Sequence, residues 1–197
     1  MNLLSYGPRA VLAEFDSLSE VMSTATAWRT AGHPGILDVV PAARTVLVVH
    51  DASFDREWLR QPLPTLSAPA IGELITIDVV YDGEDLSAVA ATLGMSRNEV
   101  VSVHSAAEYI VAFCGFMPGF SYLTGLDARL ELPRRDTPRT RVPAGSVAIA
   151  AEFSAVYPRE SPGGWHLLGR TDAAMWVDDR EPPALLPPGA RVKFRPR

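Results

Sequence analysis

One segment of the chain carries most of the side chains that can bind or transform a small molecule. It begins with the loop Cys114–Leu123, whose aromatic residues and proline are Phe116, Pro118, Phe120 and Tyr122. Aromatic rings beside exposed backbone amides suit a small planar ligand such as a cyclic amide. The same rings are typical of a barrel core, and spacing alone favours the core because apolar residues are usually buried.

A run of arginines follows this loop. Its members are Arg129, Arg134, Arg135, Arg139 and Arg141, with Pro133 and Pro138 stiffening the backbone between them. A guanidinium group can bind a carboxylate or phosphate through two hydrogen bonds. We therefore expect Arg135 and Arg139 to neutralise such a charge. Glu131 and Asp136 lie in the same stretch, so part of the run can equally be paired on a solvated surface.

Two Gly- and Pro-containing segments further along are also candidates for a ligand site. Val142–Ala150 contains Pro143 and Ser146, and the Ser146 hydroxyl can hydrogen bond a substrate carbonyl. Ser146 does not sit in a Gly-x-Ser-x-Gly pattern, so a hydrolase nucleophile elbow is not supported. The segment Ser161–Trp165 offers consecutive amides for an anion, or it is an ordinary loop anchored by its tryptophan. Its candidate contacts are Gly163, Gly164 and Trp165.

The remaining reactive residue types restrict the chemistry further. The four histidines, His33, His50, His104 and His166, form no pair with metal-ligand spacing, so no metal site is expected. His104 precedes the aromatic loop and can serve as an acid or base near neutral pH, or as a hydrogen-bonded structural residue. The single cysteine, Cys114, follows an apolar stretch and is expected to be a buried, inert thiol. No phosphate-binding P-loop pattern is present.

Length and composition favour a folded, cytoplasmic protein. The chain has 197 residues, of which 47% are hydrophobic, enough for one large domain or two small ones. A net charge of −5 argues against a general nucleic-acid binder, although a local basic site remains possible. We find no signal-peptide pattern and no run approaching the roughly 18 apolar residues that a membrane helix needs.

Residues 1–70 predict a small α/β domain. A helix is expected after Ser17 or Ser19, continuing to about Ala31, and a short helix over Phe54–Arg60. The segment Gln61–Pro69 holds three prolines and is interpreted as a linker. Alternating apolar residues predict strands at Leu3–Tyr6, Ala10–Phe15, Ile36–Val40 and Thr45–His50. Together these elements predict a ferredoxin-like sandwich of helices on one sheet.

Residues 71–197 predict a domain that is mainly β. Its helices are expected at Leu86–Leu93, capped by Asp85, and at Arg97–His104, with Ser96 and Glu99 as a capping box. Its strands are expected at Leu74–Tyr81, Tyr109–Phe113, Val147–Ala150, Ala155–Tyr157, Trp165–Arg170 and Arg191–Arg195. Many short strands with Gly and Pro between them predict a closed or nearly closed β-barrel.

Several of these segments, in this order, resemble one known family. The matching pieces are His104 with Glu108-Tyr109, Gly115–Leu123, Pro133–Arg135 with Pro138-Arg139, Val142–Val147, Tyr157-Pro158, Ser161–Trp165 and Gly169–Thr171. The chain thereby resembles the family of 5-oxoprolinase B subunits, also called the Kip inhibitor or allophanate hydrolase subunit 1 family. The resemblance is close over the carboxy-terminal half and rests on length and pattern in the amino-terminal half.

The resemblance implies an α+β protein, with a cyclophilin-like β-barrel behind the small α/β domain. It implies two partners, a homologue of the 5-oxoprolinase C subunit (the Kip antagonist) and a third subunit. The complex would open 5-oxo-L-proline to L-glutamate with ATP, and the chain alone would be inactive. Other relatives inhibit a sporulation histidine kinase or form the carboxyltransferase part of urea carboxylase. Both of these functions remain open alternatives. A cyclophilin-like shape does not imply prolyl isomerase activity.

The resemblance also sharpens the candidate site. His104, Arg139 and Ser146 are the expected catalytic residues. The expected substrate-binding residues are Phe116, Pro118, Phe120, Tyr122, Arg135, Pro143, Gly163, Gly164 and Trp165. The chain departs from the family pattern at Ala150, Ala151 and Ala155, where glycine is common, and in a shorter turn at Asp82–Asp85. The extra methyl groups narrow the backbone conformations available there.

Overall fold

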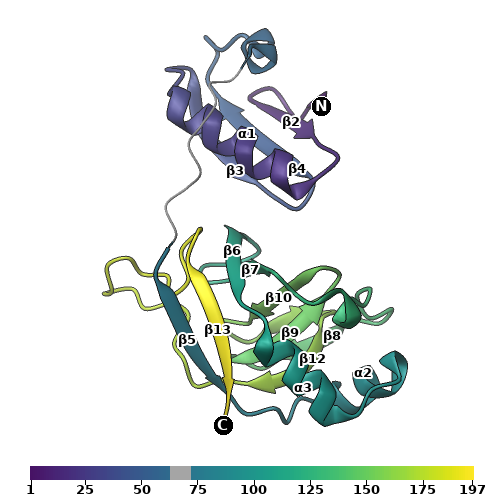
Figure 1. Ribbon diagram of the computed structural model, residues 1–197. Helices are drawn as coiled ribbons and strands as arrows, with labels where there is room; N and C mark the ends of the chain where they lie inside the picture. The colour runs from purple at the N-terminus through teal and green to yellow at the C-terminus, as the bar shows by residue number, and fades with distance from the viewer. Residues whose placement is uncertain (63–71) are drawn as a thin grey trace. The chain divides into compact units, whose positions relative to one another are not determined.

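The computed structural model describes residues 1–62 and 72–197 (Figure 1). The chain divides into two compact units, Met1–Pro69 and Ala70–Arg197. Each unit has its own cluster of buried apolar side chains. Most of the linker expected at Gln61–Pro69 lies outside the described residues.

The first unit is an antiparallel sheet with one long helix (Figure 1). The helix α1 (Leu18–Ala31) begins at a capping box, in which the Glu20 amide donates to the Ser17 hydroxyl at 3.2 Å, and it ends at Gly32, with φ of 62°. The short η1 (Arg56–Arg60) follows the sheet. The sheet order is β1-β2-β4-β3, with β1 (Asn2–Ser5), β2 (Ala10–Glu14), β3 (Ile36–Pro41) and β4 (Thr45–His50).

The connectivity of this unit corrects the expected ferredoxin-like arrangement. A ferredoxin-like domain has the order β-α-β-β-α-β, whereas here β1 and β2 come first and pair directly as a hairpin. Gly7, with φ of 74°, supplies the left-handed residue that lets the chain reverse between them. Packing between α1 and the sheet is as expected, because Val21, Ala25 and Trp28 are buried against sheet residues such as Val46.

The second unit is built on a seven-stranded sheet that is nearly closed into a barrel. Its edges meet at Val80 and Arg170, whose amides and carbonyls exchange two hydrogen bonds of 2.9 Å. The strand order is β12-β9-β10-β7-β6-β13-β5, with β5 (Leu74–Val79), β6 (Tyr109–Cys114), β7 (Ser121–Thr124), β9 (Ser146–Ala150), β10 (Phe153–Val156), β12 (His166–Arg170) and β13 (Arg191–Pro196).

Two helices and a two-stranded sheet complete the second unit. The helix α2 (Leu86–Leu93) contacts β12, and α3 (Arg97–Ala106) contacts β13. The predicted capping box of α3 is confirmed, since the Glu99 amide donates to the Ser96 hydroxyl at 3.2 Å. The separate pair is β8 (Arg139–Val142) with β11 (Ser161–Gly163), and the short η2 (Ala128–Leu130) precedes β8.

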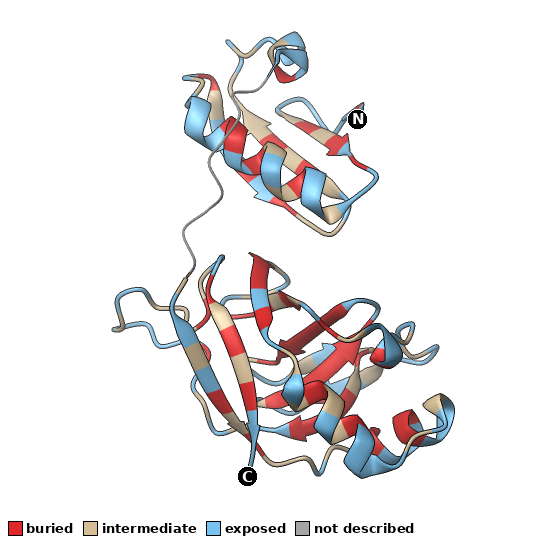
Figure 2. Cartoon of the chain, viewed as in Figure 1, coloured by how far each residue is buried: buried red, intermediate tan, exposed pale blue. Residues whose placement is uncertain are grey.

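The pattern of burial follows the strands of the second unit (Figure 2). Along β13, half-buried and buried residues alternate before the exposed end, as expected for a strand with one face on a core. Every residue of β9 is buried, so this strand is covered on both faces.

Candidate functional site

The Asp85 carboxylate accepts four hydrogen bonds, although its residue is only 3% exposed. Arg139 donates two hydrogen bonds to it, from Nη1 to Oδ2 at 2.9 Å and from Nη2 to Oδ1 at 2.8 Å. Arg135 donates from Nη1 to Oδ1 at 2.5 Å. The backbone amide of Leu167 donates to Oδ2 at 2.8 Å. One buried carboxylate therefore binds two arginines and a strand amide.

Three segments far apart in the sequence bring these groups together. Asp85 follows β5, and its amide donates to the Leu167 carbonyl at 3.1 Å, which attaches this turn to β12. Arg139 opens β8 and pairs with Gly163 of β11. The Arg135 amide donates to the Gly164 carbonyl at 2.8 Å. The predicted site residues Arg135, Arg139, Gly163 and Gly164 thus lie together, although Gly163 belongs to a strand rather than to an anion-binding loop.

Asp85 and Arg139 both stay charged at neutral pH. Burial alone would raise the pKa of Asp85, but the hydrogen bonds from Arg139 and from the Leu167 amide hold it below its usual value, aided by the charges of both arginines. The hydrogen bonds to Asp85 raise the pKa of Arg139. A buried carboxylate without such partners would be strongly destabilising. Two guanidinium groups thus surround one buried carboxylate, and the exposed Glu84 carboxylate contacts Arg139 at 3.2 Å.

The other arginines of the run have different surroundings. Arg129 pairs with Asp127 and Arg141 with Glu160, both as exposed ion pairs that contribute little to stability. Arg134 is exposed, and within the described residues it forms no ion pair. Burial raises the pKa of Tyr122, and the positive charge of Arg134 partly offsets this rise. Arg134 therefore adds positive charge close to the aromatic residues.

The aromatic residues predicted as a ligand wall form one cluster around Phe120. The Phe120 ring centroid lies 5.4 Å from that of Phe116, 5.1 Å from Tyr122 and 5.6 Å from Trp165. Phe120 and Trp165 are buried, and Tyr122 is half-buried. These rings mainly pack against one another. This packing agrees with the interpretation, favoured by their spacing, that they belong to the barrel core.

Phe116 differs from the rest of the cluster. Its side chain is 59% exposed, and its backbone adopts a φ of 66°, in the left-handed region that residues other than glycine rarely occupy. Such strain concentrates at functional positions when the surrounding structure enforces it. Pro118 of the same loop is also exposed. Among the predicted wall residues, Phe116 and Pro118 are therefore the ones that present surface to a ligand or a partner.

Pro143 lies just before β9, and Ser146 is the first residue of that strand. Pro143 is exposed, whereas Ser146 is buried and its hydroxyl donates to the Pro143 carbonyl at 2.8 Å. The Ser146 oxygen thus stabilises the turn. Gly163 is fixed by close packing, because an added Cβ would lie 2.3 Å from the Tyr157 hydroxyl.

His104 lies in the core of the second unit and has no exposed surface. The Ser154 hydroxyl donates to the Ala148 carbonyl, so it accepts from His104 Nε2 at 3.0 Å. His104 Nδ1 then accepts from the Tyr81 hydroxyl at 2.8 Å. Burial lowers the pKa of His104 to about 3. This environment favours the structural alternative for His104, because both ring nitrogens are hydrogen bonded and the side chain has no exposed surface.

Two further expectations depend on local geometry. Cys114 is half-buried rather than fully buried, and its sulfur lies 3.7 Å from the Leu186 carbonyl oxygen. Ala151, one of the departures from the family pattern, adopts a φ of 49° between β9 and β10. A glycine would adopt that conformation without strain, as the departure from the family pattern expected at this position suggests. Ala155 is fully buried within β10.

Asp85 is the member of this ion cluster that the sequence does not reveal. The sequence predicts that it caps α2, and it does occupy the N-cap position, but its side chain makes no capping hydrogen bond. Its arginine partners lie 50 and 54 residues away. No local sequence pattern predicts a contact between residues so far apart in the chain. The nearest available hint is an acidic pair, Glu84-Asp85, in a chain with an otherwise unexplained arginine run.

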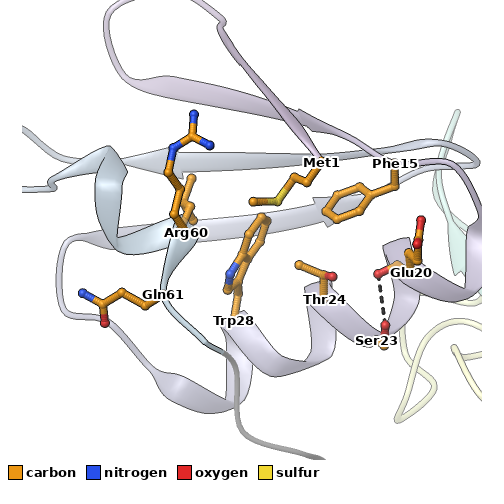
Figure 3. Close-up of a pocket in the computed structure, with 9 residues that line it drawn as sticks. Met1, Phe15, Glu20, Ser23, Thr24, Trp28, Arg60 and Gln61 are labelled. Atoms are coloured by element: carbon orange, nitrogen blue, oxygen red, sulfur yellow. Dashed lines mark hydrogen bonds between the residues drawn. The ribbon is translucent and has the colours of Figure 1, made fainter.

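A pocket of about 340 Å³ lies in the first unit (Figure 3). Trp28 and Phe15 are its aromatic residues, and the Trp28 indole nitrogen is buried without a hydrogen-bond partner among the described residues. None of the predicted site residues lines this pocket. The lining residues are Met1, Phe15, Glu20, Ser23, Thr24, Trp28, Leu59, Arg60 and Gln61.

Two kinds of feature are absent from the described parts of the chain. In residues 1–62 and 72–197, no group of three or more His, Cys, Asp or Glu side chains is arranged to hold a metal ion. No helix in the same ranges combines the length and apolar character needed to cross a membrane.

The sequence matches known proteins along nearly its whole length. Residues 1–186 match the family described as carboxyltransferase domain, subdomain C and D. The chain is 37% identical to the B subunit of 5-oxoprolinase from Escherichia coli O157:H7, over 97% of this chain and 94% of that protein. It is 44% identical to the B subunit of 5-oxoprolinase from Bacillus subtilis strain 168, over 82% of this chain and 75% of that protein.

Solved structures with the same fold cover nearly the whole chain. TTHA0988 matches 96% of this chain with a TM-score of 0.80 and 38% identity, and this chain spans 40% of TTHA0988. The Kluyveromyces lactis urea amidolyase matches 99% of this chain with a TM-score of 0.80, but at 20% identity it shares only the fold. The chain belongs to the carboxyltransferase subdomain C and D family, alongside the 5-oxoprolinase B subunits.

Proposed function

We propose that this protein is a subunit of an ATP-dependent 5-oxoprolinase complex. The complex would open 5-oxo-L-proline to L-glutamate, and the chain would act with a homologue of the 5-oxoprolinase C subunit and with a third subunit. Identity of 37% over nearly the full length of the E. coli 5-oxoprolinase B subunit supports the assignment. The cyclophilin-like barrel that the family resemblance implies belongs to this proposal, as does the cytoplasm as the compartment.

The observation that carries the proposal is the cluster of Asp85, Arg135 and Arg139. The substrate, 5-oxo-L-proline, is a lactam with one carboxylate. Arg135 and Arg139 are half-buried. The buried Asp85 carboxylate binds both of them, and the exposed Glu84 carboxylate also contacts Arg139. Guanidinium groups of this kind are well suited to bind a substrate carboxylate.

The reaction explains why this chain would need partners. An unstrained lactam is a poor electrophile, and phosphorylation of its amide oxygen by ATP would make the carbonyl carbon easier for water to attack. ATP would be bound elsewhere in the complex, since the sequence has no P-loop pattern. We assign to this chain the recognition of the substrate anion, with Arg135 and Arg139 as its ligands. Phe116 and Pro118 would present surface beside the substrate or a partner protein.

Arginine variants test this assignment in the reconstituted complex. We expect Arg139→Ala to raise KM for 5-oxoproline at least about tenfold, because it removes a charged hydrogen-bond donor from the substrate carboxylate. The matched control is Arg129→Ala, which breaks the exposed pair with Asp127 and should leave KM unchanged. Full ATP-dependent cleavage by the Arg139→Ala complex would reject the role of this site.

Two alternatives make different predictions for the same material. A histidine-kinase inhibitor would bind a kinase and leave 5-oxoproline untouched when mixed with the other subunits. A carboxyltransferase-type subunit would support ATP turnover with urea and not with 5-oxoproline. Comparing ATP turnover with each of these two substrates separates the hypotheses.

A further inference from the structure

The Asp85 carboxylate does not act as a helix cap, although Asp85 occupies a capping position. Asp85 is the N-cap residue of α2, but its side chain makes no capping hydrogen bond. An N-cap side chain normally stabilises the first turn of a helix. This helix forgoes that stabilisation, and the carboxylate is buried instead, where it needs several donors to offset the loss of water. The Asp85 side chain therefore binds the two arginines and does not cap the helix.

The carboxylate is fixed to the barrel independently of the arginines. The Leu167 amide donates to Asp85 Oδ2 at 2.8 Å, and the Asp85 amide donates to the Leu167 carbonyl at 3.1 Å. The Gly83 amide donates to the Leu168 carbonyl at 3.1 Å. Both the main chain and the side chain of Asp85 are thus attached to β12. This attachment provides a rigid acceptor at a defined place.

The arginines, by contrast, have long side chains that must be ordered. Arg135 lies outside the strands, and Arg139 is the first residue of β8. An arginine side chain loses much of its rotamer freedom when it is held in one geometry. The bonds to Asp85 hold both guanidinium groups before any ligand arrives. A site ordered in advance binds its ligand more tightly.

The cluster keeps enough charge to attract an anion. Asp85 offsets one of the two guanidinium charges. Glu84 also contacts Arg139, at 3.2 Å, but its side chain is 72% exposed, so water and salt screen this contact. Without the exposed Glu84, two half-buried guanidinium groups face one buried carboxylate, so the buried part of the cluster is positively charged.

We infer that Asp85 is a positioning residue, which holds Arg135 and Arg139 in the orientation that binds the substrate carboxylate. The inference rests on the proposed function, in which these arginines recognise 5-oxoproline. Asp85 itself need not contact the substrate.

The test uses the reconstituted complex and the variants Asp85→Asn and Asp82→Asn. Asp85→Asn keeps the size of the side chain and removes its charge, so we expect KM for 5-oxoproline to rise about tenfold or more while kcat changes less than about twofold. Asp82 lies in the same turn, and its exposed pair with Arg170 makes it a matched control, with KM unchanged. A merely structural role would reduce the amount of active complex, which lowers kcat and leaves KM as it was.

The outcomes separate this inference from the proposed function. If the wild-type complex does not cleave 5-oxoproline, the proposed function fails. If the wild-type complex cleaves it and Asp85→Asn has an unchanged KM, the positioning role fails and the function stands. Should thermal unfolding show that Asp85→Asn does not fold, Asp85→Glu decides. Its longer carboxylate would displace both arginines, so KM should rise, and an unchanged KM would overturn the inference.

Discussion

Among individual side chains, Asp85 and His104 are two buried polar residues that differ in charge. Both are almost fully buried, and each makes several hydrogen bonds. Asp85 remains charged because its donors are cationic, whereas the neutral partners Tyr81 and Ser154 suit a neutral imidazole. Asp85 can therefore organise a charged site, while His104 contributes to the core.

The neutral state of His104 predicts how stability depends on pH. Its pKa is about 3 in the folded protein, below the ordinary value of 6.5, so only the unfolded chain binds the proton between these values. The stabilisation is fully present above pH 6.5 and is lost progressively as the pH falls toward 3. Between pH 7 and pH 5 we expect this residue to lower the free energy of unfolding by about 2 kcal/mol.

Urea unfolding at pH 7 and pH 5 measures this effect, with His104→Gln as the comparison. The glutamine side chain can hydrogen bond but does not titrate, so the variant should lose less stability than the wild type between the two values. Equal losses in the two proteins would show that His104 is protonated in the folded state.

Among the strands and helices, the turn between β5 and α2 determines where the site forms. An added Cβ at Gly83 would lie 2.3 Å from the Leu167 carbonyl oxygen and 2.4 Å from the Leu168 carbonyl carbon. These are backbone atoms of β12, which cannot move as a flexible side chain would. Glycine at this position lets the turn approach β12 closely enough for Asp85 to reach the Leu167 amide.

We therefore expect Gly83→Ala to destabilise the protein by about 2 kcal/mol or more, since overpacking forces the backbone to shift. Gly115→Ala is the matched control. Its new Cβ would lie 3.6 Å from a Tyr122 ring carbon, an ordinary contact, and should cost less than about 1 kcal/mol. Chemical unfolding measures both changes. Equal stability of the two variants would mean that the turn does not need this close approach.

The sequence predicts most of these elements where a local pattern exists. Alternating apolar residues and the Ser96–Glu99 capping box locate the strand Leu74–Val79 and helix α3 to within a few residues. Three short strands are not predicted: β7 within the aromatic loop, β8 with two arginines, and β11, whose sequence is Ser-Pro-Gly. Pairing with other strands produces them: β7 pairs with β6 and β10, and β8 pairs with β11. A local sequence pattern does not record such pairing.

The candidate site is predictable to a similar extent. Residue type identifies the arginine run and the aromatic loop, and Phe120, Tyr122 and Trp165 do lie together. Burial is not visible in the sequence, so His104 and Ser146 resemble reactive groups although their polar atoms are already bonded. The contacts of Asp85 across 50 residues or more require the folded barrel.

For the chain as a whole, average charge conceals the charge at the site. The net charge is −5, yet Arg134, Arg135 and Arg139 create a cationic area on the second unit. Such an area suits a small anion better than a polyanion, because only a few positive charges are gathered against an acidic background. This distribution agrees with a metabolic enzyme subunit that acts on a carboxylate.

The proposal is tested most directly by glutamate formation from 5-oxo-L-proline and ATP in a mixture of this chain with its two proposed partners, the C-type homologue and the third subunit. We predict that glutamate and ADP form together when all three proteins are present, and that omitting this chain stops both. Urea in place of 5-oxoproline should not support ATP turnover. Glutamate formation at the same rate without this chain, or turnover with urea alone, would contradict the account.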